Sequence, residues 1–331
     1  KILHNVVPGS ENSLPNGYSS PSATDSEGGN QSAQTKTPLN IADWGVKRFI
    51  GEAPEQEWLI ENILPKGIPG LIAAIGGLGK SYIMLDLAMK VAGGDRGMHQ
   101  ETALGGKVVN NGKVVFLGAE DSANSLHRRI QNIAGANLLD RANGNLFVVP
   151  MPDAGGVVPF IQSVMGQYTS TLHYENIKKQ LIAMDNLSLV IIDPLQAFAH
   201  ADINTDPAAA QFFWSEMAEL CSLTGANVLV AHHMRKEGTF NIRKSVQARE
   251  SIRGTTALVD GARWVYGLWQ MPESDELVVA QKLGFESGIG NCVMGGIVKV
   301  NDQADNSTRA FVRAENGLLI DRTMEVDHIL V

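Results

Sequence analysis

The stretch at residues 70–81 constrains the fold of this chain more than any other part of its sequence. It reads Gly-Leu-Ile-Ala-Ala-Ile-Gly-Gly-Leu-Gly-Lys-Ser, which is an apolar run, a glycine-rich turn and then a polar pair. The residues that follow are amphipathic at helical spacing. This order of strand, glycine loop and helix predicts an α/β fold whose loop binds the phosphates of a nucleoside triphosphate.

The physical reason for phosphate binding lies at the start of the predicted helix. Backbone N–H groups there lack partners, the helix dipole adds partial positive charge, and glycines let a phosphate approach closely. Lys80 is expected to reach the β- and γ-phosphates, and the Ser81 hydroxyl to hold Mg²⁺. One departure is that Ala74 stands where the usual pattern has its first glycine. The predicted nucleotide-binding residues are Gly76, Gly77, Leu78, Gly79, Lys80, Ser81 and Tyr82.

Carboxylates follow two other apolar runs. The most apolar run of the chain ends on Asp193, and another ends on Glu120 and Asp121. Functional loops of a parallel sheet gather at one edge, so Lys80, Glu120 and Asp193 should converge. We expect Asp193 to position Mg²⁺ and Glu120 to orient or deprotonate the attacking water. Asp121 competes for the second role and is expected to be a helix N-cap.

Two adjacent histidines, His232 and His233, end a further apolar run. Neighbouring residues of a strand point to opposite faces, so the two side chains cannot form one metal site. One is expected to lie in the core. The other is expected to face the γ-phosphate and to report the nucleotide state to the segment that follows.

That following segment, residues 234–253, is called the basic segment here. It holds six basic and two acidic residues in a chain of net charge −8. A solvated charged loop and a nucleic-acid-binding loop both fit this composition. Arg253 and Lys282 are candidates for a positive charge supplied across a subunit interface. The residues expected to contact nucleic acid are Arg235, Lys236, Arg243, Lys244 and Arg249.

Composition predicts the domain boundaries of the chain and the cellular compartment in which it is expected to work. The first 38 residues are polar and are expected to be a flexible tail or linker, and the ATPase domain is expected over residues 39–331. Cys221 and Cys292 lie far apart without metal-type spacing, so they are expected to be free thiols of a cytoplasmic protein. No apolar run reaches the length of a membrane span, so no membrane contact is expected.

The order of apolar runs predicts a mostly parallel central sheet flanked by helices. Residues 151–172 are rich in Gly, Pro, Ser and Thr, and a long loop is expected there. Late runs are expected to add antiparallel strands at one edge of the sheet. These late runs are residues 264–268, 277–283, 293–300 and 309–312.

Five short stretches occur in an order typical of one protein family. They are Ala-Ile-Gly-Gly-Leu-Gly-Lys-Ser at 74–81, Phe-Leu-Gly-Ala-Glu-Asp at 116–121, Val-Ile-Ile-Asp-Pro at 190–194, Leu-Val-Ala-His-His-Met-Arg-Lys at 229–236 and Ser-Ile-Arg-Gly-Thr-Thr-Ala-Leu-Val-Asp-Gly-Ala-Arg-Trp at 251–264. Over about residues 44–300 the chain resembles the RepA-type plasmid and phage replicative helicases of the RecA-like ATPase superfamily.

The resemblance implies a RecA-like P-loop core that assembles as a homohexameric ring, with single-stranded DNA in the centre and ATP between subunits. It implies that Lys80 and Ser81 bind phosphate and Mg²⁺, that Glu120 is the catalytic carboxylate and that Asp193 is associated with Mg²⁺. His232 or His233 matches the sensor. Arg253 falls where the family carries its arginine finger, and Lys282 is expected on the strand that carries a second finger. The basic segment corresponds to a loop that faces DNA.

The expected function is therefore an ATP-driven DNA translocase that unwinds DNA during replication of a plasmid, phage or other mobile element. Two alternatives share every nucleotide motif. One is a RecA-like recombination or repair ATPase that coats DNA, and the other is a regulatory ATPase of the circadian-clock type that acts on a protein partner.

Overall fold

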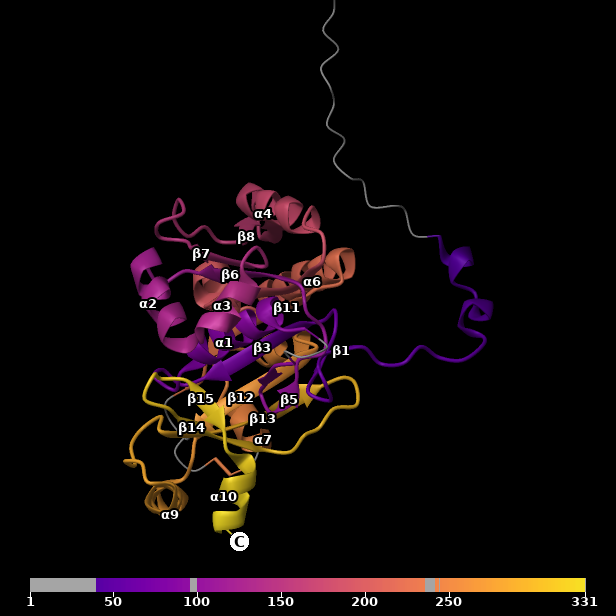
Figure 1. Ribbon diagram of the computed structural model, residues 1–331. Helices are drawn as coiled ribbons and strands as arrows, with labels where there is room; N and C mark the ends of the chain where they lie inside the picture. The colour runs from indigo at the N-terminus through magenta and orange to yellow at the C-terminus, as the bar shows by residue number, and fades with distance from the viewer. Residues whose placement is uncertain (1–39, 96–99, 236–241, 244, 331) are drawn as a thin grey trace, which may run out of the picture. The chain divides into compact units, whose positions relative to one another are not determined.

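The structure is a computed structural model that describes residues 40–95, 100–235, 242–243 and 245–330 (Figure 1). The described residues fall into two units, which are treated separately, with the boundary between Pro54 and Glu55. The predicted tail over residues 1–38 lies outside the described residues, so the predicted domain boundary stays a prediction.

The described part of the shorter unit is residues 40–54. It holds two 3-10 helices, η1 (Ile41–Trp44) and η2 (Val46–Phe49). Asn40 caps η1, because its side-chain oxygen accepts a hydrogen bond from the N–H of Ala42. Apolar side chains of both helices are exposed within this unit.

The described part of the longer unit is built on a nine-stranded sheet with the order β15-β14-β13-β12-β3-β11-β10-β6-β7. From β12 to β7 neighbouring strands are parallel, whereas β13, β14 and β15 continue the sheet antiparallel. This arrangement confirms the predicted parallel sheet with antiparallel edge strands. The strands are β3 (Pro69–Ala74), β6 (Lys113–Gly118), β7 (Leu146–Pro150), β10 (Leu187–Asp193), β11 (Asn227–His233), β12 (Trp264–Gln270), β13 (Cys292–Val300), β14 (Arg309–Arg313) and β15 (Leu319–Asp321).

Helices cover both faces of this sheet, which is why its central strands read as continuous apolar runs. All residues of β3, β10 and β12 are buried. Helix α1 packs against β6 and β10 and contacts α2 and α3, while α6 packs against β3 and β11 and contacts α4 and α8. The helices are α1 (Lys80–Gly93), α2 (Ala123–Ile133), α3 (Ala136–Ala142), α4 (Leu172–Ile182), α5 (Leu195–Phe198), η3 (Ala201–Asn204), α6 (Pro207–Thr224), α7 (Ser245–Glu250), α8 (Thr256–Gly261), α9 (Glu273–Leu283) and α10 (Thr323–Leu330).

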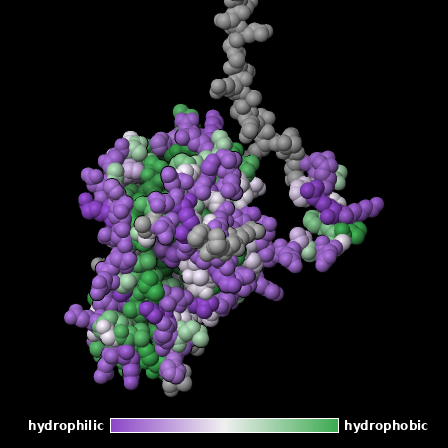
Figure 2. All heavy atoms as spheres, in the orientation of Figure 1, coloured by the Kyte–Doolittle hydropathy of each residue, from purple (hydrophilic) through white to green (hydrophobic). Residues whose placement is uncertain are grey.

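The surface of the longer unit is mainly polar. Figure 2 shows hydrophilic side chains over most of the visible face, with a narrow strip of apolar side chains running between them. Among the described residues, no helix combines the length and the apolar character that a membrane crossing requires. Cys221 and Cys292 are buried and free, as predicted, and burial raises the pKa of each thiol to about 12.

Within the described ranges, three small antiparallel sheets accompany the large one, and one of them corrects the expected loop over residues 151–172. A hairpin lies there, because Met165 and Gly166 both adopt positive φ, at 52° and 79°, as a tight two-residue hairpin turn requires. The hairpin was not predicted from the sequence, because Met is rare at the turn position that Met165 occupies. The strands of the small sheets are β1 (Trp58–Ile60), β2 (Leu64–Pro65), β4 (Thr102–Ala103), β5 (Gly106–Lys107), β8 (Ile161–Val164) and β9 (Gln167–Ser170).

The expected strand over residues 277–283 is wrong, and so is the expected placement of Lys282 on a strand. Helix α9 occupies this region and carries Lys282 in its last turn. Helix signals outweigh the short apolar run: Pro272 precedes the helix, acidic residues fill the first turn, and Gly284 ends it in the left-handed conformation at φ 77°. The other three late runs are strands β12, β13 and β14, as predicted.

Candidate nucleotide-binding site

The glycine loop, residues 75–79, joins β3 to α1 as the sequence predicts. Gly77 and Gly79 both have φ of 87°, and Gly79 is the N-cap of α1. A Cβ atom at Gly76 or Gly77 would meet no heavy atom of the described residues within 4 Å, so the loop is open on that side. Ala74 is the last residue of β3, where a methyl group fits the extended backbone and the buried core. Ala74, which replaces the first glycine of the usual pattern, therefore lies within strand β3 and outside the glycine loop.

Lys80 begins α1 and is buried, with 8% of its surface exposed. Its Nζ donates to the carbonyl oxygen of His232 at 3.4 Å and forms no ion pair within the part of the chain that the structure describes. Burial lowers the pKa of Lys80, against the opposing effect of the negative charges of Asp193 and Glu120. A cation with so little hydration interacts strongly with an anion that enters the loop.

The two predicted carboxylates lie at the same edge of the sheet as Lys80. Asp193 is the buried last residue of β10, and its register partner on the neighbouring parallel strand β6 is Gly118. Glu120 comes two residues after that strand ends and is exposed. The negative charges of both carboxylates raise the pKa of Lys80 against the effect of burial. The strand ends that carry them are thus gathered at one edge of the parallel sheet, as expected, and the role of each side chain stays a prediction.

Asp121 is not the N-cap of α2, which corrects its expected role. Ser122 caps the helix, because its Oγ accepts from the N–H of Ser125 at 3.3 Å. Asp121 instead forms an ion pair with Arg129 and accepts a hydrogen bond from the Ser125 hydroxyl. The cap is displaced by one residue because Asp121 is held by its partners one and two turns into the helix.

The two histidines at the end of β11 face different surroundings. His232 is 1% exposed, its Nε2 lies 2.7 Å from the carbonyl oxygen of Arg253, and burial lowers its pKa to about 4. His233 is half-buried, and its pKa is lowered first by burial and then by the charge of Lys80. His232 therefore belongs to the frame of the site, while His233 faces open space.

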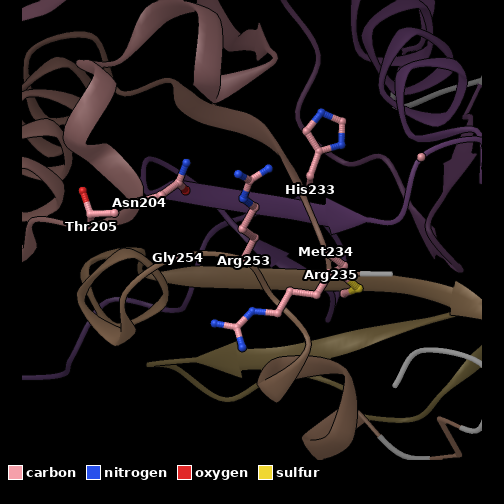
Figure 3. A pocket seen from close by; sticks show the side chains of 8 residues that line it. Asn204, Thr205, His233, Met234, Arg235, Arg253 and Gly254 are labelled. Atoms are coloured by element: carbon pink, nitrogen blue, oxygen red, sulfur yellow. The ribbon is translucent and has the colours of Figure 1, made fainter. Parts of the chain in front are cut away.

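That space is a cavity of about 800 Å³ beside the glycine loop. Figure 3 shows the side chains of His233 and Arg253 extending to the same side, whereas Arg235 extends the other way. Asn204 has a buried Oδ1 without a hydrogen-bond partner among the described residues, and no motif in the sequence marks it or Thr205. The residues that line the cavity are Gly76, Asn204, Thr205, His233, Met234, Arg235, Arg253 and Gly254.

Pairing at the base of the basic segment places Arg253 in this cavity. The N–H of Arg253 donates to the carbonyl oxygen of His233 at 3.2 Å, and the N–H of Arg235 donates to that of Ser251 at 2.8 Å. Met234 and Ile252 form an antiparallel bridge between these contacts. Residues distant in the sequence are thereby held side by side next to the glycine loop.

The predicted nucleic-acid residues have mixed positions. Arg243 pairs with Asp275 at 3.1 Å and Arg249 with Asp260 at 2.6 Å, and all four side chains retain solvent exposure. Arg235 is exposed at the cavity, and Lys282 is exposed on α9, among residues that do not line the cavity. The predicted residues Lys236 and Lys244 lie outside the described residues.

Comparisons with known proteins identify the family and similar folds. A family model described as an AAA domain matches residues 35–239, more than half of the chain. The structure of a DnaB-like replicative helicase with its primase interactions has a TM-score of 0.51 at 14% identity, covering 86% of this chain and 67% of that chain. This likeness concerns the fold alone and confirms the predicted RecA-like P-loop architecture.

Two further solved structures are similar at lower TM-scores. One is described as an ATPase domain and has a TM-score of 0.49 at 16% identity, covering 77% of this chain and 85% of that chain. The other, the RadB recombinase, has a TM-score of 0.45 at 11% identity, covering 76% of this chain and 90% of that chain.

Proposed function

The chain belongs to the AAA domain family, and from that premise we propose that it binds ATP and hydrolyses it at the glycine loop. One observation carries the proposal. Lys80, Glu120 and Asp193 follow or end three strands at one edge of the sheet, both carboxylates raise the pKa of Lys80, and the open glycine loop borders a cavity of about 800 Å³.

The donors present fit a magnesium–nucleotide complex. The glycine loop offers backbone N–H groups at the start of α1, and Lys80 offers a weakly hydrated cation. Ser81 and Asp193 offer the oxygen ligands that Mg²⁺ prefers. When bound, Mg²⁺ neutralises charge on the phosphates. Glu120 then orients or deprotonates the attacking water, and His233 faces the cavity as the sensor of the γ-phosphate.

We further propose that ATP hydrolysis drives movement along single-stranded DNA, as in the RepA-type helicases that the sequence resembles. The basic segment begins directly after His233, so a change at the γ-phosphate has a short path to residues that bind phosphate backbones. Arg243 and Arg249 are exposed on this segment, and weak surface ion pairs leave them available to DNA. The proposed setting is replication of a plasmid, phage or other mobile element.

Two variants test ATP binding and hydrolysis separately. Lys80→Ala is expected to lose both, because it removes the phosphate-binding cation. Glu120→Gln is expected to retain ATP binding and to lose hydrolysis by about 10²–10⁴-fold, the usual contribution of a general base. Calorimetric titration with ATP and a phosphate-release assay measure the two properties. ATP hydrolysis by Glu120→Gln at the normal rate contradicts the role of Glu120.

The same assay tests the action on DNA. Single-stranded DNA is expected to stimulate ATP hydrolysis by the wild-type chain, and the chain is expected to separate a forked duplex. Neutralising Arg243 and Lys244 should remove the stimulation and leave ATP binding intact. Imaging with a non-hydrolysable ATP analogue adds the assembly: a closed ring supports the helicase, an open filament on DNA supports a recombinase, and the absence of DNA stimulation removes both.

A further inference from the structure

Arg313 lies against the glycine loop, although it belongs to the far antiparallel strand β14. A Cβ atom at Gly79 would lie 3.1 Å from both Nη1 and Nη2 of Arg313 and 3.5 Å from its Cζ. Because both Nη atoms are nearer to this position than Cζ is, the guanidinium presents its Nη1–Nη2 edge to Gly79. Gly79 is favoured at this position by its positive φ, and a methyl group here would also press on the Arg313 guanidinium, which would have to shift by a few tenths of an ångström.

Two backbone carbonyls hold the guanidinium in place. Its Nε donates to the carbonyl oxygen of Gly290 at 2.7 Å, and its Nη1 donates to that of Gly317 at 3.0 Å. A Cβ atom at Gly290 would lie 3.1 Å from Nη2 and 3.3 Å from the carbonyl oxygen of Gly77. Arg313 and Gly290 thus lie together next to the glycine loop, close to Gly79 and Gly77.

Gly290 is in turn held by Gln270 at the end of β12, and Gln270 is bonded to Glu276 in the first turns of α9. Gln270 Oε1 accepts from the N–H of Gly290 at 2.7 Å, and Gln270 Nε2 donates to Glu276 Oε2 at 2.6 Å. Glu276 Oε1 accepts from the N–H of Gly288 at 3.0 Å. Gln270 is 6% exposed and Glu276 4% exposed, so the bond between their side chains is buried. A continuous chain of contacts therefore runs from α9 to the glycine loop.

Arg313 also brings a positive charge that its own surroundings leave uncompensated. Within the described residues its Nη2 is buried without a hydrogen-bond partner, and Arg313 forms no ion pair there. Burial lowers the pKa of Arg313, with an opposing effect from the Tyr82 phenol next to the loop. A half-buried cation without an anion is unfavourable, and an anion in the adjoining loop relieves this cost.

We propose that Arg313 is a positioning residue for the nucleotide: it supports the glycine loop at Gly79 and links it, through Gly290, to the Gln270–Glu276 pair. This inference rests on the proposed function, because it assigns Arg313 to the same phosphate site. No motif marks Arg313 in the sequence. It is brought to the loop only because the sheet continues beyond β12 with antiparallel strands.

The test compares ATP affinity among variants by calorimetric titration in the presence of Mg²⁺. Arg313→Ala is expected to weaken ATP binding about tenfold, or ~1.4 kcal/mol. Arg313→Lys keeps the charge but cannot bond Gly290 and Gly317 as a fork, so it is expected not to restore the affinity. Arg322→Ala is the matched control, because Arg322 pairs with Glu325 on the exposed surface of α10 and is expected to bind ATP normally.

Gln270→Ala separates positioning from a general loss of stability. It leaves Arg313 in place and frees Gly290, so it is expected to weaken ATP binding in the same direction. The double variant with Arg313→Ala should bind no more weakly than Arg313→Ala alone, since both act through Gly290. Additive losses, or ATP binding by Arg313→Ala at wild-type affinity, overturn the inference. If Arg313→Ala does not fold, wild-type affinity in Gln270→Ala overturns it equally.

The failure of this inference is distinguishable from failure of the proposed function. A wild-type chain that binds no ATP, and that Lys80→Ala does not alter, contradicts the proposed function itself. A wild-type chain that binds ATP in a Lys80-dependent manner, with Arg313→Ala unaffected, contradicts only the role of Arg313.

Discussion

His232 and His233 are neighbours in the sequence, and because side chains alternate along β11, they point to opposite faces of the sheet and have different roles. His232 points into the core and holds the carbonyl oxygen of Arg253, so it orients the base of the basic segment. His233 faces the cavity together with the Arg253 side chain. The sequence left open which of the two is the sensor, and burial favours His233. The two neighbouring histidines of β11 therefore differ in role: His232 supports the structure of the site, and His233 faces the space where a ligand would bind.

Acid is expected to destabilise the folded chain through His232. Burial lowers the pKa of its imidazole from 6.5 to about 4, so between these values the unfolded chain binds a proton that the folded chain does not. Through this group the free energy of unfolding should fall as pH drops from about 6.5 to 4, by up to ~3 kcal/mol, and the contribution of His232 to the loss is complete below that range. Denaturant titrations at a series of pH values measure this loss.

The comparison variant for this prediction is His232→Gln, which cannot titrate. Its unfolding free energy should depend less steeply on pH in the same interval, although its value at neutral pH is lower because the packing is altered. His127→Gln, at an exposed position of α2, serves as the control and should retain the wild-type dependence. Equal slopes for wild type and His232→Gln are incompatible with the buried, neutral imidazole.

At the scale of elements, the turn from β3 to α1 shows that its glycines are not equivalent. Gly79 has φ of 87° and lies against the Arg313 guanidinium, whereas Gly76 has an ordinary φ and open space around its Cα. A side chain would therefore be strained at position 79 and accommodated at position 76. The glycine-rich motif contains positions required by geometry next to a position that the fold itself does not restrict.

Gly79→Ala is accordingly expected to lower the free energy of unfolding by ~1–3 kcal/mol, the range for a strained backbone position. It should also weaken ATP binding, because the methyl group presses on the Arg313 guanidinium. Gly76→Ala is the matched control and should change the free energy of unfolding by less than about 0.5 kcal/mol. Thermal and denaturant unfolding without nucleotide provide the comparison. Equal stabilities of the two variants argue against the packing of Arg313 on Gly79.

At the scale of the whole molecule, we propose that subunits share the site in a homohexameric ring, as the family resemblance implies. Arg253 is exposed, and its backbone is fixed by His232 and His233, which suits a residue that supplies charge to a neighbouring phosphate site. In the single chain the same side chain lines its own cavity, so action within one chain is the alternative outcome. Lys282 is a weaker candidate for the charge, since it lies on α9.

Mixing two inactive variants decides between these outcomes. Arg253→Ala should bind ATP and fail to hydrolyse it, and Lys80→Ala should fail in both. In a shared site, Arg253 of a Lys80→Ala subunit completes the site of an Arg253→Ala subunit, so mixed oligomers should regain hydrolysis. Phosphate release after co-refolding or subunit exchange is the measurement. Mixed oligomers without activity place Arg253 in its own chain's site, and normal hydrolysis by Arg253→Ala removes it from catalysis.

The sequence by itself determined the glycine loop, the parallel core, and the three strand ends that carry Glu120, Asp193 and the histidines. These features follow from local periodicity and from the rule that parallel strands end at one edge, so they need no knowledge of distant contacts. Local signals were insufficient where two patterns competed, as in α9, whose helix ends outweigh its apolar run.

Only the tertiary structure decided which side chains complete the site. Asn204, Thr205 and Arg313 carry no motif, and each is brought to the glycine loop by pairing or packing between segments far apart in the sequence. The same holds for the choice of His233 over His232, because burial depends on what covers each face of β11. Such placements arise from the order of strands in the sheet, and a linear pattern contains no record of that order.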